Sequence, residues 1–413
     1  MIFSLKNEVI KMKVKVCTSR ASISVLFAAA YMVSYLTRIN FGAVISEMVS
    51  ATGFSQSLLS LSLTGGFVTY GVGQIISGFL GDRISPKRLV AIGFFTTVVM
   101  NVLIPFCPNP YWMMALWCLN GFAQSLMWPP MVKIMTAYLT EEEYKTSVTK
   151  VSWGSSFGTI LVYLVAPLLI TFSGWRAVFF ASALCGAVML FIWLLLSPDA
   201  AVVPRVVQKT KSDSSAFRIL FSPLMLGVML AIVFQGILRD GVTTWMPSYL
   251  AQTYDLSNSV SILTGVVMPL FGILCYQIAT TLYVKKLTNP LSCGGILALF
   301  GAVSALGLYL FSGTSPVLSV AFTAVLIGCM HGVNLMLVCM IPPFFKRFGN
   351  VSAASGIINS CTYVGSAVST YGVALISEKS GWGVTLFLWF LCAVAATALC
   401  FLCARGFKKK IMM

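Results

Sequence analysis

The chain has 413 residues, of which 58% are hydrophobic and only 9% are charged, and this composition excludes a water-soluble globular protein. Its formal net charge of +16 at pH 7 comes from short basic blocks that separate long apolar runs. That distribution argues against a nucleic-acid partner. Apolar runs of membrane-spanning length indicate instead an integral membrane protein that crosses the lipid bilayer many times.

In chain order, the apolar runs predict twelve transmembrane helices. Helices are expected because the bilayer offers no water to satisfy open backbone groups, and because the alternating pattern of a membrane β-barrel is absent. The expected fold class is therefore an all-α membrane protein. The predicted spans are 21–46, 58–80, 88–107, 111–138, 147–171, 175–196, 219–249, 260–284, 291–311, 316–341, 352–376 and 382–404.

Lysines and arginines in the loops predict the orientation, since they favour cytoplasmic loops. One side of the membrane receives only Arg176 and Lys379. The basic blocks of the other side lie in both terminal tails and in the loops around 81–88, 145–150, 197–218, 285–286 and 346–347. We therefore expect both termini in the cytoplasm and a multi-pass protein of the plasma (inner) membrane. The basic N-terminus leads into a full-length span, so no cleavable signal is expected.

One long polar connection, 197–218, separates six predicted spans from six others. Each set of six is expected to form a helical half of its own, with this connection as a cytoplasmic loop between them. The predicted division is an N-terminal tail at 1–20, a first half at 21–196, the loop at 197–218, a second half at 219–404 and a C-terminal tail at 405–413.

Short motifs recur between the two predicted halves at one offset. A parallel repeat of six helices about an axis normal to the membrane resembles the architecture of the major facilitator transporters, whose substrate site lies between the halves near the bilayer midplane. The matches, each 207 residues apart, are Gly121 with Gly328, Gly158 with Gly365, and "SGW" at 173–175 with "SGW" at 380–382.

Two arginines stand inside predicted spans, one in each half. Arg38 lies nine residues before Glu47 in the first span, and Arg239 lies 21 residues after Arg218 in the seventh. Their spacing of 201 residues is close to the repeat offset, so we expect them to face each other across the central cavity. Two guanidiniums repel each other there, and both offer bidentate hydrogen bonds to carboxylate or phosphate. A dianion bridging them is the simplest occupant; snorkelling is the alternative for Arg38 alone.

Other polar side chains within the spans are weaker candidates. Lys133 adds a third cation to the site, or it snorkels toward the cytoplasmic end of its span. Asp240 is the one acid that we place deep in a span, and it is a candidate for coupling or for pairing with an arginine. The remaining candidates for substrate contact, each with helix packing as its alternative, are Tyr35, Gln74, Gln124, His331, Asn334, Asn359 and Tyr363.

At these residues the chain resembles the organophosphate:phosphate antiporters of the major facilitator superfamily. The resemblance implies exchange of a sugar phosphate or glycerol phosphate for inorganic phosphate, with Arg38 and Arg239 as the phosphate ligands. Tyr35 and Tyr363 match tyrosines of the family pattern. The segments that carry the resemblance are "YLTRINF" in the first span, "YGVGQIISGFLGDRISPKR" through the second, "WPP" in the fourth and "LRDGVTTWMPSYL" in the seventh.

The chain departs from this family at two positions in the expected pocket. Gln74 stands where members carry a lysine, and Ser155 stands where they carry a histidine. A different organic anion is therefore the alternative substrate. The loop "GDRISPKR" is expected to act at a cytoplasmic gate, where Asp82, Arg83 and Arg88 form salt bridges or helix-end contacts, in addition to fixing topology.

The function expected from these features is secondary antiport by alternating access, carried out by a monomer. The sequence leaves two alternatives open: a proton-coupled symporter that uses Asp240 or His331, and an anion sensor of the same fold that does not transport. We expect no cofactor, metal site or enzyme activity, because the chain has one histidine, no close acidic cluster and no nucleophile–base pattern.

Overall fold

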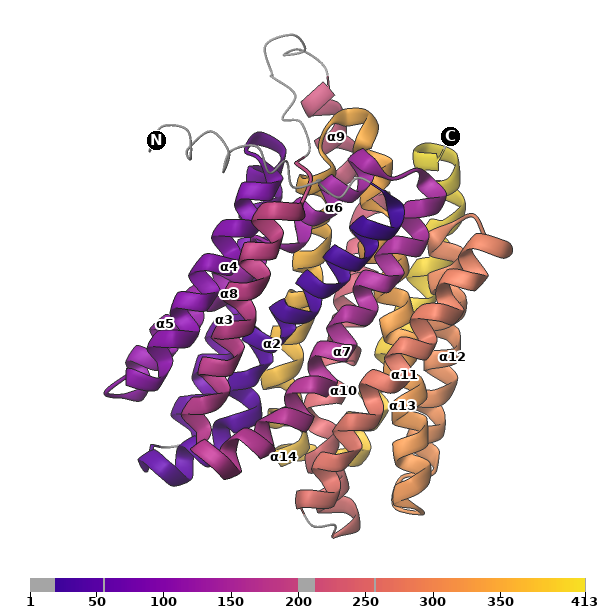
Figure 1. The fold of residues 1–413 in the computed structure, drawn as a ribbon. Coiled ribbons are helices and arrows are strands. Elements are labelled where there is room, and N and C mark those ends of the chain that lie inside the picture. Colours follow the sequence, from indigo (N-terminus) through magenta and orange to yellow (C-terminus); the bar gives the residue numbers. More distant parts are fainter. Residues whose placement is uncertain (1–18, 55, 200–211, 256–257, 413) are drawn as a thin grey trace, which may run out of the picture.

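The structure, a computed structural model, describes residues 19–54, 56–199, 212–255 and 258–412. Every regular element in these ranges is helical, and the long helices run side by side through the length of the molecule (Figure 1). The elements are α2 (Arg20–Thr52), α3 (Gln56–Arg83), α4 (Pro86–Leu103), η1 (Ile104–Phe106), α5 (Pro110–Ser125), α6 (Trp128–Tyr138), α7 (Glu141–Ser173), α8 (Trp175–Leu196), α9 (Ser212–Leu220), α10 (Pro223–Tyr254), α11 (Asn258–Lys285), α12 (Pro290–Leu310), α13 (Pro316–Asn334), η2 (Leu335–Cys339), η3 (Pro342–Phe348), α14 (Val351–Phe407) and η4 (Lys408–Met412).

Ten helical segments of the described chain are long and apolar enough to cross a membrane, against the twelve predicted. The predicted span 111–138 is interrupted, because α5 ends at Ser125 and the two prolines of "WPP" begin a new helix, α6. The predicted spans 352–376 and 382–404 both lie in α14, which consists of two helices that meet at a kink at Gly381, where φ is 79°. The predicted break between these two spans therefore falls where the chain turns, and the segment of α14 that is long and apolar enough begins at Leu375.

Several helices begin where a serine or asparagine precedes a proline. The side-chain oxygen caps N–H groups of the first turn, and proline fills a position whose N–H would have no partner. Asn109, for example, accepts from the backbone N–H groups of Tyr111 and Trp112 at 3.1 Å each. The same arrangement starts α10 at Pro223 rather than at the predicted residue 219. The segment before it, predicted as loop, contains the short helix α9.

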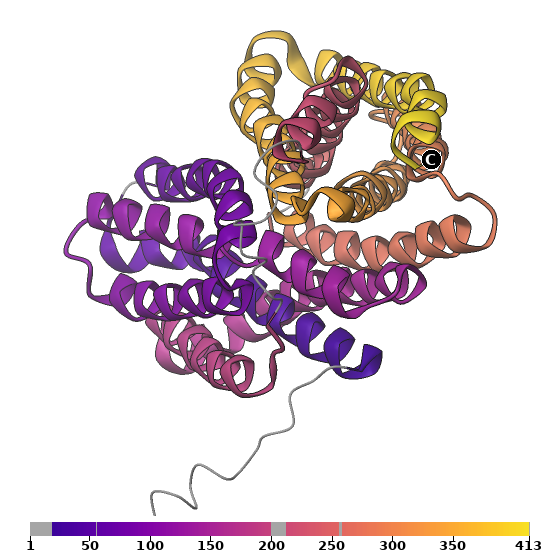
Figure 2. The same cartoon turned by 90° about the horizontal axis from the view of Figure 1, so that it is seen from above.

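The helices gather in two groups when the molecule is viewed from above (Figure 2). Helices α2–α8, from indigo to magenta, form one group, which we call the N-terminal half. Helices α10–α14 form the other, which we call the C-terminal half. Contacts between the halves are made mainly by α3 with α14 and by α7 with α11.

Paired glycines pack the two halves in the same way. A Cβ atom on Gly158 of α7 would lie 2.6 Å from the Met32 carbonyl oxygen of α2, and one on Gly365 of α14 would overlap the Val233 carbonyl oxygen of α10. Glycine is required at both places because the helix backbones approach so closely. Met32 and Val233 each lie six residues before an arginine, Arg38 or Arg239, so the two arginines follow equivalent helix contacts.

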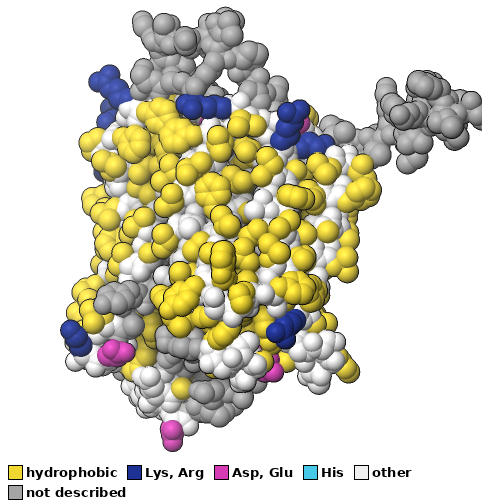
Figure 3. Space-filling view, turned by 90° about the vertical axis from the view of Figure 1, so that its left-hand side faces the viewer, with side chains coloured by type: hydrophobic (Ala, Val, Ile, Leu, Met, Phe, Trp, Pro, Cys, Tyr) yellow, Lys and Arg dark blue, Asp and Glu magenta, His cyan; other side chains and the backbone are white. Residues whose placement is uncertain are grey.

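The outer surface matches a lipid environment. In Figure 3 a broad hydrophobic band covers the middle of the molecule, and lysine and arginine side chains lie mostly along one edge. Phe95, Phe191 and Phe300 are each more than 60% exposed, a cost in water that lipid removes. We call the end that carries exposed basic side chains of α3, α4, α11, α14 and η4 the basic end; they include Arg83, Arg88, Lys285, Arg405 and Lys408.

Candidate anion-binding site

Arg38 lies on α2 among aromatic rings. Its guanidinium carbon is 4.2 Å from the ring centre of Tyr35 and 4.9 Å from that of Tyr70 on α3. These are cation–π distances, which offset part of the cost of enclosing the charge. The Nε atom is buried without a hydrogen-bond partner, and Arg38 forms no ion pair with a described residue. Aromatic faces of Tyr35 and Tyr70 therefore surround the guanidinium.

The rings around Arg38 reach across both halves. Tyr70 and Tyr363 of α14 have ring centres 4.5 Å apart, which joins α3 to the C-terminal half. Tyr31 lies 5.3 Å from Tyr35 and 5.0 Å from Trp128 on α6, again between ring centres. Offset and tilted ring pairs at these distances are stabilising. The aromatic cluster thus fixes the surroundings of one arginine with groups from both halves.

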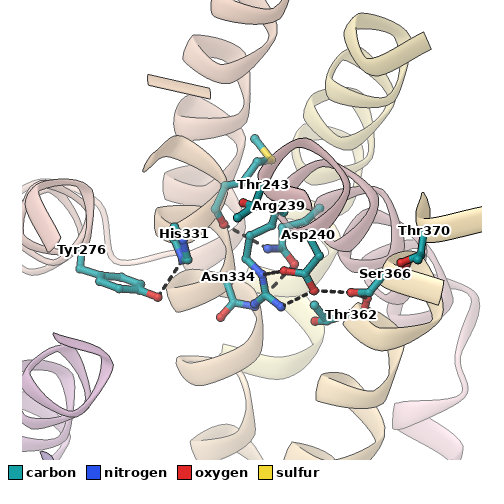
Figure 4. Close-up of polar contacts among 11 residues, drawn as sticks. Arg239, Asp240, Thr243, Tyr276, His331, Asn334, Thr362, Ser366 and Thr370 are labelled. Atoms are coloured by element: carbon teal, nitrogen blue, oxygen red, sulfur yellow. Dashed lines mark hydrogen bonds and ion pairs between the residues drawn. The ribbon is translucent and has the colours of Figure 1, made fainter. Parts of the chain in front are cut away.

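Arg239 lies on α10 and is paired with its neighbour in the sequence. Its Nε donates to Oδ1 of Asp240 at 2.7 Å, and its second guanidinium nitrogen donates to Oδ2 at 2.8 Å. Ser366 of α14 also donates to Oδ2 of Asp240. The side chains of Arg239 and Asp240 are 15% and 30% exposed. Figure 4 shows this bidentate pair with Ser366 beside it.

Tyr35 and Tyr363 connect the two arginines. Both phenol groups lie close enough to interact electrostatically with the guanidinium of Arg38 and with that of Arg239. Tyr35 comes from α2 and Tyr363 from α14, so each half contributes one of the shared rings. The two forks and two phenol groups are the kind of donors that bind carboxylate or phosphate oxygens.

His331 lies between Tyr276 and the Arg239–Asp240 pair (Figure 4). Its Nδ1 atom is 3.0 Å from the Tyr276 hydroxyl of α11, and the two rings are in edge contact. Asn334, one turn further along, donates to Gln235 at 3.5 Å. These groups provide polar atoms around Arg239. The sequence alone predicts them as candidates but does not predict their contacts.

Two other predicted residues lie on the faces between helices. Gln74 is fully buried on α3, and neither its amide nitrogen nor its amide oxygen has a hydrogen-bond partner. It stands one helical turn after Tyr70, and so on the same face of α3. Asn359 is buried on α14, one turn before Tyr363. Both therefore stay candidates for contact with an anion.

Gln124 makes the helix-packing contact that was the alternative to substrate contact. Its amide donates to the Thr37 hydroxyl at 2.8 Å, while Asn120 and Asn101 donate to the Thr37 carbonyl at 3.2 and 3.1 Å. The group is buried and ties α2 to α4 and α5 immediately before Arg38. Gln124 therefore supports the helix that bears the arginine and has its amide nitrogen engaged in packing.

Comparison with known proteins identifies the fold. The sequence profile described as Major Facilitator Superfamily matches residues 27–370, most of the chain. The chain belongs to the Major Facilitator Superfamily.

Solved transporters of this superfamily share the fold over nearly the whole chain. The proton:xylose symporter XylE superposes with a TM-score of 0.74 at 14% identity, covering 95% of this chain and 96% of that one. The transporter FucP in its outward conformation gives 0.73 at 10% identity, covering 92% and 98%. At these identities the likeness concerns the fold alone, and it confirms the predicted fold class.

Curated relatives are similar at low identity. A probable hexose phosphate transport protein of Chlamydia trachomatis is 22% identical, covering 89% of this chain and 87% of that protein. The glycerol-3-phosphate transporter of Bacillus subtilis is 27% identical, covering 54% and 55%. The membrane sensor protein UhpC of Escherichia coli is 22% identical, covering 85% and 84%.

In this superfamily member, Asp82 joins the halves near the basic end. Its carboxylate accepts from the backbone N–H groups of Ser352 at 3.2 Å and Ala353 at 2.8 Å, at the N-terminus of α14. Lys133 of α6 is 3.6 Å from the same carboxylate and donates to the Gly81 carbonyl at 2.9 Å. We call these four residues, Asp82, Lys133, Ser352 and Ala353, the Asp82 cluster. A carboxylate is stabilised at a helix N-terminus by the helix dipole.

The Asp82 cluster changes two of the roles expected from the sequence. Lys133, expected as a third cation for the substrate, contacts Asp82 instead. Arg83 and Arg88 are exposed, and the backbone N–H of Arg88 donates to the Ser85 hydroxyl at 3.2 Å, which caps the start of α4. Of the three residues expected at the gate, Asp82 is the one that contacts the opposite half.

Further hydrogen bonds join the halves toward the basic end of this transporter. The Tyr144 hydroxyl of α7 donates to the Cys339 carbonyl at 2.7 Å, and the Thr149 and Thr280 hydroxyls are 2.5 Å apart. Lys346 donates to the Thr136 carbonyl. The halves are therefore held together on this side by polar contacts as well as by packing.

Proposed function

We propose that this transporter carries a small organic anion by alternating access, and that the anion is an organophosphate exchanged for inorganic phosphate. The observation that supports this most is the arrangement of Arg38 and Arg239, whose guanidiniums both interact electrostatically with Tyr35 and Tyr363. Two planar forks with phenol groups between them suit an anion with several oxygens. The relatives named as hexose phosphate and glycerol-3-phosphate transporters support the same substrate class.

In this proposal both halves bind the same anion. Its oxygens accept hydrogen bonds from Arg38 of the N-terminal half and from Arg239 of the C-terminal half. The halves then rock about the bound anion and expose it to the other side of the membrane. The Asp82 cluster must come apart each time the basic end opens, since Asp82 and Ala353 belong to different halves.

The contacts of Asp82 suit a reversible role in that cycle. The carboxylate accepts from two backbone N–H groups of the C-terminal half, which water can replace when the basic end opens, whereas Lys133 belongs to the same half as Asp82. We therefore assign the Asp82 cluster the closing of the basic end, with Lys133 keeping the carboxylate in position.

A non-transporting anion sensor is the second candidate. It is favoured by the similarity to membrane sensor protein UhpC, which covers most of both chains. The two candidates use the same arginines and differ only in whether the anion crosses the membrane.

Counterflow in liposomes that contain only the purified protein tests the proposal. Liposomes loaded with unlabelled phosphate are given labelled phosphate, and glycerol 3-phosphate, glucose 6-phosphate and succinate are then added as competitors. The proposal expects uptake of label that an organophosphate inhibits. Binding of phosphate without counterflow would favour the sensor, and counterflow inhibited by succinate alone would show a different organic anion.

A further inference from the structure

The Arg239–Asp240 pair is unusual in its geometry. Neighbouring residues on an α-helix point about 100° apart and do not normally face each other. Here both side chains turn to the same side and form two hydrogen bonds, at 2.7 and 2.8 Å. Ser366, on another helix, donates to the same carboxylate (Figure 4). The pair is thus supported by α14 and is formed by the protein's own side chains.

The two arginines are compensated in different ways. Arg239 has a carboxylate on its fork, whereas Arg38 has aromatic faces and no ion pair with a described residue. Two guanidiniums and one carboxylate leave this group of three with a net charge of +1. His331 of α13 and Tyr276 of α11, which are hydrogen-bonded to each other, lie on another side of the pair. Asp240 is the anion that lies nearest to the second arginine.

Asp240 and a bound anion compete for the same donors. Of the two edges by which the Arg239 guanidinium can bind a phosphate or carboxylate in a bidentate contact, Asp240 occupies the one formed by Nε and a terminal nitrogen. When no anion is bound, the pair can form and the enclosed cavity contains one fewer uncompensated cation. An unpaired charge is costly to enclose in a low-dielectric interior, so a carrier without this pair would reorient readily only when loaded.

We propose that Asp240 is an intramolecular counter-ion that replaces the substrate on Arg239 and so lets the unloaded transporter reorient. The consequence is net transport of the anion in addition to one-for-one exchange. This inference rests on the proposed anion transport, but it concerns a property that exchange assays do not measure. It also assigns Ser366 a positioning role, because its hydroxyl keeps the Asp240 carboxylate on the α14 side.

The test compares two fluxes in the same liposomes. Liposomes are loaded with labelled phosphate, and the membrane potential is clamped with a potassium ionophore. Exchange is the loss of label into medium that contains unlabelled phosphate, and net efflux is the loss into medium without a transported anion. The ratio of exchange to net efflux is compared for the unchanged protein, Asp240→Asn, Asp240→Glu and Ser366→Ala. Asp255→Asn, the same substitution at the exposed end of α10, is the matched control.

The expected result is net efflux within about tenfold of exchange for the unchanged protein and for Asp255→Asn. Asp240→Asn raises the ratio at least tenfold, Ser366→Ala raises it less, and Asp240→Glu keeps it low. If Asp240→Asn does not fold, Ser366→Ala gives the test, since the carboxylate is then intact.

Two outcomes overturn the inference while leaving the proposed function in place. The first is exchange with net efflux at background in the unchanged protein, and the second is a ratio that neither Asp240→Asn nor Ser366→Ala alters. No exchange of phosphate at all would overturn the proposed exchange and this inference with it.

Discussion

Arg38 and Arg239 each lie six residues after a residue, Met32 or Val233, that packs against a glycine of another helix. Their side chains nevertheless have different partners. Depth in the span and the spacing of 201 residues were enough to single out both arginines from the sequence. Their partners were harder to predict. Tyr70 was predictable as a partner, since it lies one turn before Gln74 in the segment "YGVGQIISGFLGDRISPKR". The contact of Ser366 was not, because it depends on how α14 packs on α10, and no local sequence pattern predicts that packing.

Gln74 and Gln124 show why residue type alone does not identify a ligand. Both are buried glutamines on helices of the N-terminal half, and both were candidates for substrate contact. The amide nitrogen of Gln124 is engaged by Thr37, while the amide of Gln74 has no partner. An unpaired buried amide costs about 1 to 3 kcal/mol of stability. Such a cost is tolerated most easily where the group serves function.

The first prediction uses this pair of glutamines. Gln74→Leu removes an unpaired buried amide, so the melting temperature of the purified protein should rise while phosphate counterflow falls. Gln124→Leu removes a paired one, so the melting temperature should fall. Thermal unfolding in detergent and counterflow on the same preparations provide both values. A lower melting temperature for Gln74→Leu would mean that its amide is satisfied in solution.

At the scale of the elements, prolines and capping residues explain several differences from the predicted spans, whereas the turn at Gly381 lies at a predicted break. The break between α5 and α6 follows from "WPP", and the turn inside α14 follows from the positive φ of Gly381. Boundaries that depend on capping, such as the start of α10 after Ser222, were shifted by a few residues. The hydropathy of a segment does not contain this information, because caps and breaks act through single residues.

The second prediction concerns the glycines between elements. Gly365→Ala should lower stability by about 2 kcal/mol or more, because its Cβ would overlap the Val233 carbonyl oxygen and backbones cannot easily move apart. Gly383→Ala meets no atom within 4 Å and should be neutral or stabilising, since alanine favours the helix by about 1 kcal/mol. Denaturant or thermal unfolding of the two variants makes the comparison. Equal effects would contradict the close approach of α14 to α10.

The third prediction concerns the Asp82 cluster. Asp82→Asn removes the charge that binds the N-terminus of α14 and Lys133, so the basic end should open more often. Cys339, buried at 4% exposure beside Tyr144 of the other half, should then react faster with a maleimide. Mass spectrometry of the labelled peptides measures the rate, with the partly exposed Cys107, which follows η1, as internal control. An unchanged rate at Cys339 would show that Asp82 does not keep this end closed.

At the scale of the whole molecule, the fold class followed from composition and apolar run length, and membership of the superfamily agrees with it. The orientation of the molecule in the membrane is a separate inference. This inference rests on the gathering of lysines and arginines at the basic end, an asymmetry visible in Figure 3. The contacts between halves could not be predicted, because they depend on how the halves are tilted, which the repeat does not determine.

The fourth prediction tests the orientation of the molecule. If the basic end is cytoplasmic, an amine-reactive reagent that does not cross membranes should label Lys379 in intact cells and leave Lys285 and Lys286 unlabelled. All three side chains are exposed, so accessibility within the protein does not bias the result. Permeabilised cells provide the control in which all three react. Labelling of Lys285 but not Lys379 in intact cells would reverse the topology.

The central claim is that Arg38 and Arg239 bind one anion together. A double-mutant cycle of anion affinity tests it most directly, with calorimetric titration of glycerol 3-phosphate into the purified protein, Arg38→Lys, Arg239→Lys and the double variant. Lysine retains the charge and loses the fork, and Arg218→Lys at an exposed position is the control. We predict at least tenfold weaker binding for each single variant and little further loss in the double variant. Unchanged affinity in either single variant, or losses that simply multiply, would contradict a shared anion.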